Sequence, residues 1–276
     1  MPLARMQDLL ATARAERRGI GAMNVIQLEH AEAIVGGAEQ AGRPVVLQVS
    51  ENTVAYHGSL APILSATLAV AEQASVGVVV HLDHATDVDL VHQAVVLGAP
   101  SVMFDASTLD YDANVARTAE VVAWCHDRGV SVEAELGEVG GKDGVHAPGV
   151  RTGPAEAAGF VAATGIDALA VAVGSSHAMT TRDAELDDDL IAELAAAVPV
   201  PLVLHGSSGV PDDGLVSAVA AGMTKVNIAT HLNVALTRAV RQALEDEELV
   251  DPRKFLGPGR DAVAAEVARL LTLLGG

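Results

Sequence analysis

Side chains able to bind a metal ion or to transfer a proton recur at one kind of position in this chain. They stand at the ends of short runs of apolar, mostly β-branched residues. These side chains are Asn24, Ser50, Asp83, His84, Asp105, Glu135, His177, His205 and Asn227. Three neutral imidazoles make a good site for zinc or a similar borderline metal, and they leave positions open for substrate oxygens. The pattern therefore predicts that His84, His177 and His205 bind a divalent metal, with zinc as the first choice.

Asp83 directly precedes the first of these histidines. If its carboxylate turns toward a substrate, it can act as a general acid and base. If it turns toward the metal ligands, it instead orients one of them. The sequence favours the first role. His81, two residues earlier in the same run, is expected to pack inside or to support a ligand.

The apolar runs themselves predict eight β-strands. Their ranges are 21–24, 44–50, 76–84, 100–105, 130–136, 167–173, 201–205 and 225–229. Helical, alanine-rich stretches separate them, and strands that are apolar on both faces imply a parallel sheet covered by helices. The count of eight, with no G-x-G-x-x-G after the first strand, favours a (β/α)₈ TIM barrel over an open doubly wound sheet. In such a barrel the carboxyl ends of the strands form the active site.

The length of 276 residues suits one barrel, which typically needs about 250 residues. We therefore expect residues 1–276 to form a single barrel domain, with an N-terminal helix that closes the bottom and a C-terminal helical extension. The glycine-rich stretch 137–154 follows the fifth predicted strand, and a long loop of this kind is usually functional.

Two short segments predict a phosphate site. HGSSG at 205–209 ends the seventh predicted strand, and NIAT at 227–230 ends the eighth. Barrel enzymes often bind phosphate between these two loops through backbone amides. Gly206 would let the backbone approach closely, and Ser207, Ser208 and Thr230 would add hydroxyl donors.

Composition excludes several classes of partner. The net charge is −19 and the sequence pI is about 4.7, which argues against binding to nucleic acid or to an anionic membrane. Cys125 is the single cysteine, so no intrachain disulfide can form. Neither a signal peptide nor a membrane-spanning stretch is recognisable, so a cytoplasmic location is expected.

Six motifs, in this order, resemble the class II, metal-dependent ketose-bisphosphate aldolases. They are HLDHA at 81–85, MFDAS at 103–107, VEAELGEVGG at 132–141, GSSHA at 174–178, VPLVLHGSSGVP at 200–211 and TKVNIAT at 224–230. The resemblance implies a TIM-barrel lyase of carbohydrate metabolism, as in glycolysis, that works as a homodimer or homotetramer. Its reaction would be the reversible cleavage of fructose 1,6-bisphosphate, tagatose 1,6-bisphosphate or a related ketose phosphate to dihydroxyacetone phosphate and an aldehyde.

The resemblance also implies roles for individual residues. His84, His177 and His205 would hold a catalytic Zn²⁺, Asp105 and Glu135 a second or alternate metal position, and a monovalent cation would assist. Asp83 would be the acid/base, and Asp143 stands where the family carries a loop glutamate that moves the C3 proton. The residues matching those that hold the substrate are Asn24, Ser50, Ala178, Gly206, Ser207, Ser208, Asn227, Ile228, Ala229, Thr230 and Arg253. Arg253 resembles an arginine that reaches the far phosphate, in some members from a neighbouring subunit.

Departures from the family pattern bear on the substrate. Asp143 is one methylene shorter than the usual glutamate, Ala178 replaces a glycine, and a lysine common just beyond it is missing. We therefore expect fructose 1,6-bisphosphate to be a mediocre substrate. Two alternative functions stay open. The chain could be a noncatalytic barrel subunit that supports an aldolase, or it could be another metal-dependent sugar-phosphate lyase or isomerase. No lysine is expected at a strand end, which disfavours a Schiff-base mechanism.

Overall fold

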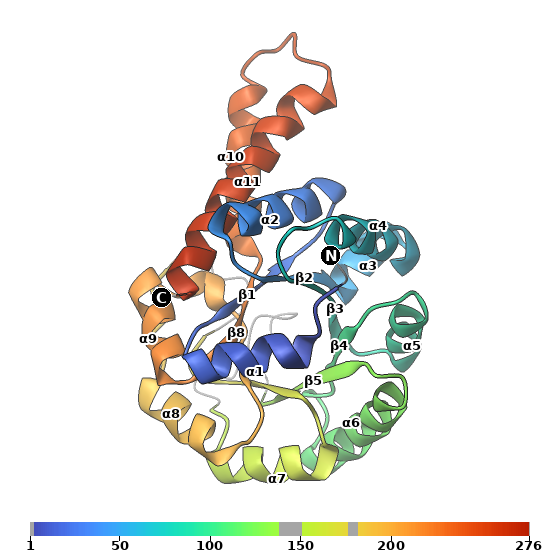
Figure 1. The fold of residues 1–276 in the computed structure, drawn as a ribbon, viewed down its shortest axis with the longest axis vertical. Helices are drawn as coiled ribbons and strands as arrows, with labels where there is room; N and C mark the ends of the chain where they lie inside the picture. The colour runs from blue at the N-terminus through green and yellow to red at the C-terminus, as the bar shows by residue number, and fades with distance from the viewer. Residues whose placement is uncertain (1–2, 138–150, 176–181, 276) are drawn as a thin grey trace.

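The computed structural model describes residues 3–137, 151–175 and 182–275. Eight parallel strands close into a barrel in chain order, which confirms the predicted TIM barrel (Figure 1). The strands are β1 (Ile20–Asn24), β2 (Val45–Ser50), β3 (Val78–Ala85), β4 (Ser101–Phe104), β5 (Ser131–Leu136), β6 (Ala168–Val171), β7 (Leu202–Leu204) and β8 (Met223–Ile228). Every predicted segment overlaps one of them.

The ends of the predicted segments differ from the observed strands by a few residues. β4 ends at Phe104 rather than at Asp105, and β7 ends at Leu204, one residue before His205. Asp105 and His205 each follow the last residue of their strand, although the apolar pattern still includes them. These side chains therefore belong to the mouth of the barrel and not to its wall.

Helices form a ring around the barrel (Figure 1). The ring and its connections contain α2 (Leu28–Ala41), α3 (Glu51–His57), α4 (Leu60–Glu72), α5 (Val88–Val96), α6 (Tyr111–His126), α7 (Pro154–Thr164), α8 (Asp188–Ala197) and α9 (Asp212–Ala221). Outward-facing strand residues such as Leu47 and Leu82 pack against helix residues such as Ile34, and all three are fully buried. Burial on both sides of the sheet explains why the strands read as continuous apolar runs.

The bottom of the barrel is apolar and closed by α1 (Met6–Glu16). Met6, Leu9 and Leu10 pack against inward-facing residues from the amino-terminal halves of several strands, among them Ile20 and Val46. The polar residues of the barrel interior are thus displaced toward the carboxyl ends of the strands, where the site was predicted.

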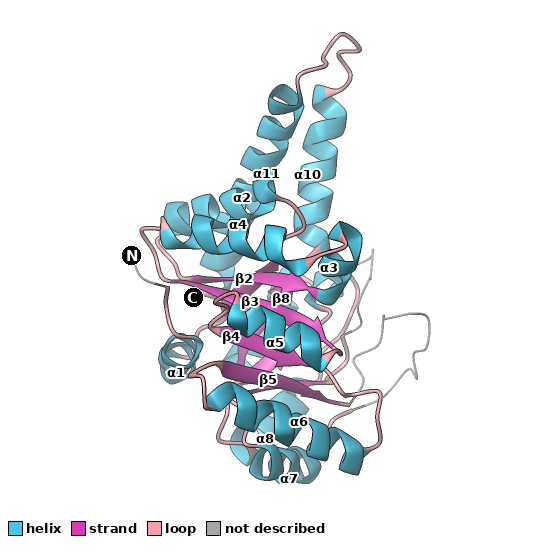
Figure 2. Ribbon diagram, turned by 90° about the vertical axis from the view of Figure 1, so that its right-hand side faces the viewer, coloured by secondary structure: helices cyan, strands magenta, loops and turns pink. Residues whose placement is uncertain are grey.

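The last two helices form a hairpin that projects from the barrel (Figure 2). They are α10 (Thr230–Ala243) and α11 (Pro252–Leu274), and α11 packs along both α10 and α2. Val234, on α10, keeps 60% of its surface exposed, and Val250, in the connection, keeps 83%. No single described helix is long and apolar enough to cross a membrane, and α3 and α4, which would be so only as a pair, are bent by 116°.

Candidate active site

His84 reaches the mouth of the barrel through an irregularity in β3. The pairing of β3 with β4 shifts register between Leu82 and Ala85, and His84 has a left-handed φ of 52°. Adjacent residues of a regular strand point to opposite faces, so Asp83 and His84 would otherwise be separated by the sheet. Their ligand atoms instead lie within 4.8 Å of each other. A left-handed non-glycine residue costs on the order of 1–3 kcal/mol, and such residues cluster at functional sites.

Imidazole and carboxylate groups converge there from four strands. The ligand atoms of Asp83, His84 and His205 lie within 4.8 Å of one another, and so do those of His84, Asp105 and Glu135. Nδ1 of His205 is 2.9 Å from Oε2 of Glu135, and the rings of His84 and His205 meet edge to face with centroids 4.5 Å apart. This set of nitrogen and oxygen donors fits a borderline divalent metal such as zinc.

His205 lies between two carboxylates. Besides Glu135, its Nε2 faces Oε1 of Glu133 at 3.1 Å. Complete burial by itself would lower the pKa of His205, but hydrogen bonds to Glu133 and Glu135 raise it to about 9. At neutral pH this ring is therefore an imidazolium when no metal is bound, and a metal ion would replace a proton.

Asp83 is held by an amide on each side. Its Oδ2 accepts a hydrogen bond from Nδ2 of Asn24 at 3.4 Å, and its Oδ1 accepts one from Nδ2 of Asn227 at 3.3 Å. Burial opposes ionisation of Asp83, but electrostatic interactions with His84, Lys225 and His205 outweigh it and lower the pKa to about 2. The group is thus a carboxylate at neutral pH, which is the form that a general base requires.

A second polar layer lies directly beneath this site, and the sequence interpretation expected a supporting role only for its member His81. Its main members are Gln48, Glu133 and Lys225, all buried, together with His81, whose Nδ1 is 2.8 Å from Oγ of Ser101. Each of Gln48, His81, Glu133 and Lys225 stands two residues before a predicted site residue. Side chains two apart on a strand share a face, so this spacing was a signal that could have identified the layer.

The loops after β7 and β8 meet, as the phosphate prediction requires. Gly206 has a left-handed φ of 66° and leads into a 3₁₀ turn, Ser207–Gly209. The hydroxyl of Ser207 donates a hydrogen bond to the backbone oxygen of Asn227 at the end of β8. Nε2 of His231 contacts the backbone oxygen of Ser208 at 3.2 Å. Ile228 ends β8, and Ala229 and Thr230 lead into α10, so this segment borders the same mouth.

Five predicted residues have other surroundings or fall outside the structure's description. Oγ of Ser50 accepts a hydrogen bond from the backbone nitrogen of Thr53 and so caps α3. Arg253 lies at the start of α11, near the tip of the hairpin, where it pairs with Asp251 and stays 90% exposed. The hairpin tip projects away from the barrel (Figure 1). Asp143, His177 and Ala178 lie outside the described residues.

Comparison with known proteins gives a consistent match over the whole chain. The family model for class II fructose-bisphosphate aldolase matches residues 4–276. The fructose-bisphosphate aldolase of Geobacillus stearothermophilus is 39% identical over 272 residues, which cover 97% of this chain and 95% of that protein. The crystal structure of the YdjI aldolase from Escherichia coli K12 superposes with a TM-score of 0.87 at 31% identity, covering 99% of this chain and 97% of that one. A putative aldolase from Coccidioides immitis gives a TM-score of 0.88 at 29% identity, covering 98% and 96%.

Fold and site together define a TIM-barrel enzyme of a metal-dependent class, with the acid/base candidate Asp83 beside the ligand candidates. The chain belongs to the class II fructose-bisphosphate aldolase family. It is a carbon–carbon lyase of the ketose-bisphosphate type, as the sequence motifs predicted.

Proposed function

We propose that Asp83 is the acid/base of the aldol reaction of this enzyme, beside a zinc ion held by His84, His177 and His205. The position of the Asp83 carboxylate supports this role, because it lies within 4.8 Å of the ligand atoms of both His84 and His205. When bound, the cation polarises the carbonyl oxygen of the ketose. Asp105 and Glu135 offer a second or alternate metal position, and a monovalent cation assists at the phosphate.

The residues of the chain then carry the proton transfers. In the cleavage direction Asp83 takes the proton of the C4 hydroxyl as the C3–C4 bond breaks, and in condensation it returns that proton to the aldehyde oxygen. Asp143 moves the proton at C3. The dihydroxyacetone-phosphate half is held by Asn24, Ser50, Ala178, Gly206, Ser207, Ser208, Asn227, Ile228, Ala229 and Thr230.

The preference among phosphorylated ketoses depends on the cationic side chains near the loops after β7 and β8. Arg182 is committed elsewhere, since its guanidinium donates to the backbone oxygen of Val210 at 2.9 Å and to Asp212 at 2.5 Å. It fixes the loop after β7 and does not replace the missing lysine. A charge-assisted contact to phosphate contributes roughly 1.5–3 kcal/mol, so its loss weakens binding by about 10- to 100-fold. Fructose 1,6-bisphosphate is therefore a mediocre substrate, and a related phosphorylated ketose is preferred.

One assay tests both parts of this proposal. Retro-aldol cleavage is measured across a panel of phosphorylated ketoses, with and without chelator. Release of dihydroxyacetone phosphate that disappears with chelator supports the mechanism. A kcat/KM for fructose 1,6-bisphosphate at or above about 10⁵ M⁻¹s⁻¹, within the ordinary enzyme range, would contradict the substrate preference and leave the mechanism standing.

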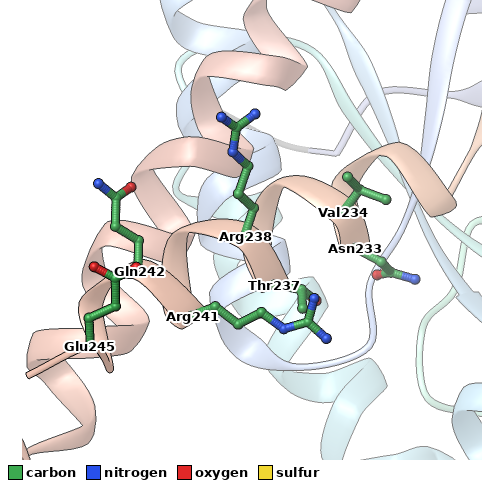
Figure 3. Close-up of a pocket in the computed structure, with 7 residues that line it drawn as sticks. All are labelled: Asn233, Val234, Thr237, Arg238, Arg241, Gln242 and Glu245. Atoms are coloured by element: carbon green, nitrogen blue, oxygen red, sulfur yellow. The ribbon is translucent and has the colours of Figure 1, made fainter. Parts of the chain in front are cut away.

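We also propose that the enzyme is a cytoplasmic homodimer or homotetramer in which the α10–α11 hairpin contacts a neighbouring copy. Support comes from a groove of about 590 Å³ along α10, lined by residues that include Val234, Arg238, Arg241 and Glu245 (Figure 3). Arg253, exposed near the hairpin tip, then serves the active site of the neighbour, where it binds the far phosphate. Sedimentation of the purified protein measures the number of subunits, and a monomer at micromolar concentration contradicts the proposal.

A further inference from the structure

The amide of Asn227 can face Asp83 with either its nitrogen or its oxygen, because the two ends of an asparagine amide have nearly the same shape. Only the nitrogen can donate to the Asp83 carboxylate. We propose that Lys225 is a positioning residue that decides this orientation, and that Gln48 does the same, more weakly, for Asn24 on the other side. The inference rests on the proposed acid/base role of Asp83.

Lys225 faces the oxygen end of Asn227. Its Nζ lies 2.9 Å from Oδ1 of Asn227, whose Nδ2 in turn lies 3.3 Å from Oδ1 of Asp83. A lysine ammonium can only donate hydrogen bonds. If the amide were reversed, its NH₂ group would face the ammonium and its oxygen would face the carboxylate. Both contacts would then be repulsive, so Lys225 permits one orientation alone.

Lys225 is itself fixed in place. It is fully buried, and its Nζ pairs with Oε2 of Glu133 at 2.8 Å. The other oxygen of Glu133 contacts His205 at 3.1 Å. A buried ammonium with two fixed acceptors cannot swing away from Asn227 without weakening its ion pair with Glu133, which is unfavourable inside a protein.

The opposite side of Asp83 is built from neutral groups. Nε2 of Gln48 donates to Oδ1 of Asn24 at 3.3 Å, and Nδ2 of Asn24 lies 3.4 Å from Oδ2 of Asp83. Gln48 is fully buried, and its Oε1 has no hydrogen-bond partner in the described part of the chain. A glutamine can reverse its own amide, whereas an ammonium has no acceptor to offer. The orientation of Asn24 is therefore held less strongly than that of Asn227.

The first experiment compares Lys225→Met with Lys254→Met in the full-length, zinc-loaded enzyme. Methionine keeps the length of the lysine chain but has no donor, and Lys254 is an exposed residue of α11. We expect Lys225→Met to lower kcat by about 10²-fold, the scale of a misplaced catalytic group, with normal zinc content. Lys254→Met should match the unaltered enzyme. A kcat for Lys225→Met within about threefold of that of the unaltered enzyme overturns the inference.

A double-mutant cycle then separates positioning from a general structural role. In Asn227→Ala there is no amide left to orient, so adding Lys225→Met should lower kcat by no more than about twofold. An undiminished effect of Lys225→Met in the Asn227→Ala background overturns the inference, because Lys225 would then act by another route. Asp83→Ala is measured alongside. If it keeps its turnover, the proposed function fails, whatever the cycle shows.

Hydrogen exchange of the Asn227 side-chain amide gives a readout that does not depend on turnover. The amide is observed by NMR in zinc-loaded protein with ¹⁵N-labelled asparagine. Its signal is assigned by its absence from the spectrum of Asn227→Ala. Its hydrogen exchange should accelerate in Lys225→Met and stay slow in Lys254→Met. Equal exchange rates in the two variants contradict the inference.

Lys225→Met leaves Glu133 buried without its cation and can fail to fold. In that event Glu133→Gln combined with Lys225→Met is compared with Glu133→Gln alone. A kcat about 10²-fold lower in the double variant than in Glu133→Gln alone supports the inference, and an equal kcat in the two proteins overturns it.

Discussion

Nδ1 of His84 lies 3.0 Å from Oδ2 of Asp105, across the neighbouring strands β3 and β4. The carboxylate is fixed from its other side, because Oδ1 of Asp105 accepts hydrogen bonds from the backbone nitrogen and the hydroxyl of Ser107, at 3.2 and 2.7 Å. Asp105 therefore presents a rigid acceptor that sets the direction of the His84 ring.

This relationship predicts the effect of Asp105→Ala. Loss of a carboxylate that orients a ligand histidine typically weakens metal binding by about 10- to 100-fold. We expect that loss in a zinc titration, with a much smaller change in kcat once zinc is saturating. Asp110→Ala is the control, since Asp110 caps the exposed start of α6. Unchanged zinc affinity in Asp105→Ala would contradict the orienting role.

Removal of the metal should abolish catalysis, because the proposed mechanism needs the cation to polarise the carbonyl oxygen of the ketose. Dialysis against a chelator is expected to remove activity, and added zinc or cobalt to restore it. Full activity in chelator, together with inactivation by borohydride in the presence of substrate, would point to a Schiff-base mechanism instead.

Asp83→Ala should retain near-normal zinc content and lose about 10²- to 10⁴-fold in turnover, the usual scale for a positioned acid/base. Asp83→Asn keeps the shape of the side chain and should lose a similar factor, because an amide cannot accept the proton. Zinc content and kcat are measured on the same preparations. Loss of zinc from Asp83→Ala would show that Asp83 binds or orients the metal ligands.

Zinc binding should release a proton from His205 at neutral pH. The pKa of this residue is raised to about 9 in the metal-free protein, so zinc must displace that proton and its affinity should rise with pH up to about 9. Calorimetry in buffers of different ionisation enthalpy measures the release. Glu133→Gln removes one of the two carboxylates that raise the pKa and should reduce the release at pH 7. Equal proton release in both proteins would contradict this assignment.

The raised pKa of His205 also predicts how the stability of the folded protein depends on pH when zinc is absent. The pKa of His205 in the folded protein lies above its ordinary value of 6.5, so the protonated ring favours the folded state. That contribution is complete below pH 6.5 and is lost as the pH rises through about 9. Thermal unfolding of the metal-free protein should therefore shift to lower temperature between these values, and the shift should shrink in Glu133→Gln. A constant melting temperature across this range argues against a charged His205.

The proposed cross-subunit role of Arg253 can be tested by mixing inactive copies. Asp83→Ala and Arg253→Ala should each be impaired alone. After subunit exchange, a mixed oligomer contains a site with an intact Asp83 served by an intact Arg253 from the other copy, so activity should return. No gain on mixing, with exchange verified by differently tagged subunits, would place Arg253 outside the active site.

The sequence alone determined the barrel and the composition of its mouth. Eight apolar runs separated by helical stretches can bury their side chains only as a closed or doubly covered parallel sheet, and such a sheet gathers its strand-end residues at one edge. His84, Asp105, Glu135 and His205 were therefore identifiable without coordinates.

Tertiary structure alone decided how these groups contact one another. The left-handed turn at His84 arises from the pairing of β3 with β4, and no local pattern encodes it. The contacts of Lys225 with Glu133 and of Asn227 with Asp83 join strands far apart in the sequence. They depend on the stagger of the strands around the closed barrel, which fixes the height at which each side chain meets its partners. Strand periodicity indicates on which face of the sheet a side chain lies, but not its height along the barrel axis. The orientation of Asp83 therefore follows from the closed barrel and not from the sequence pattern.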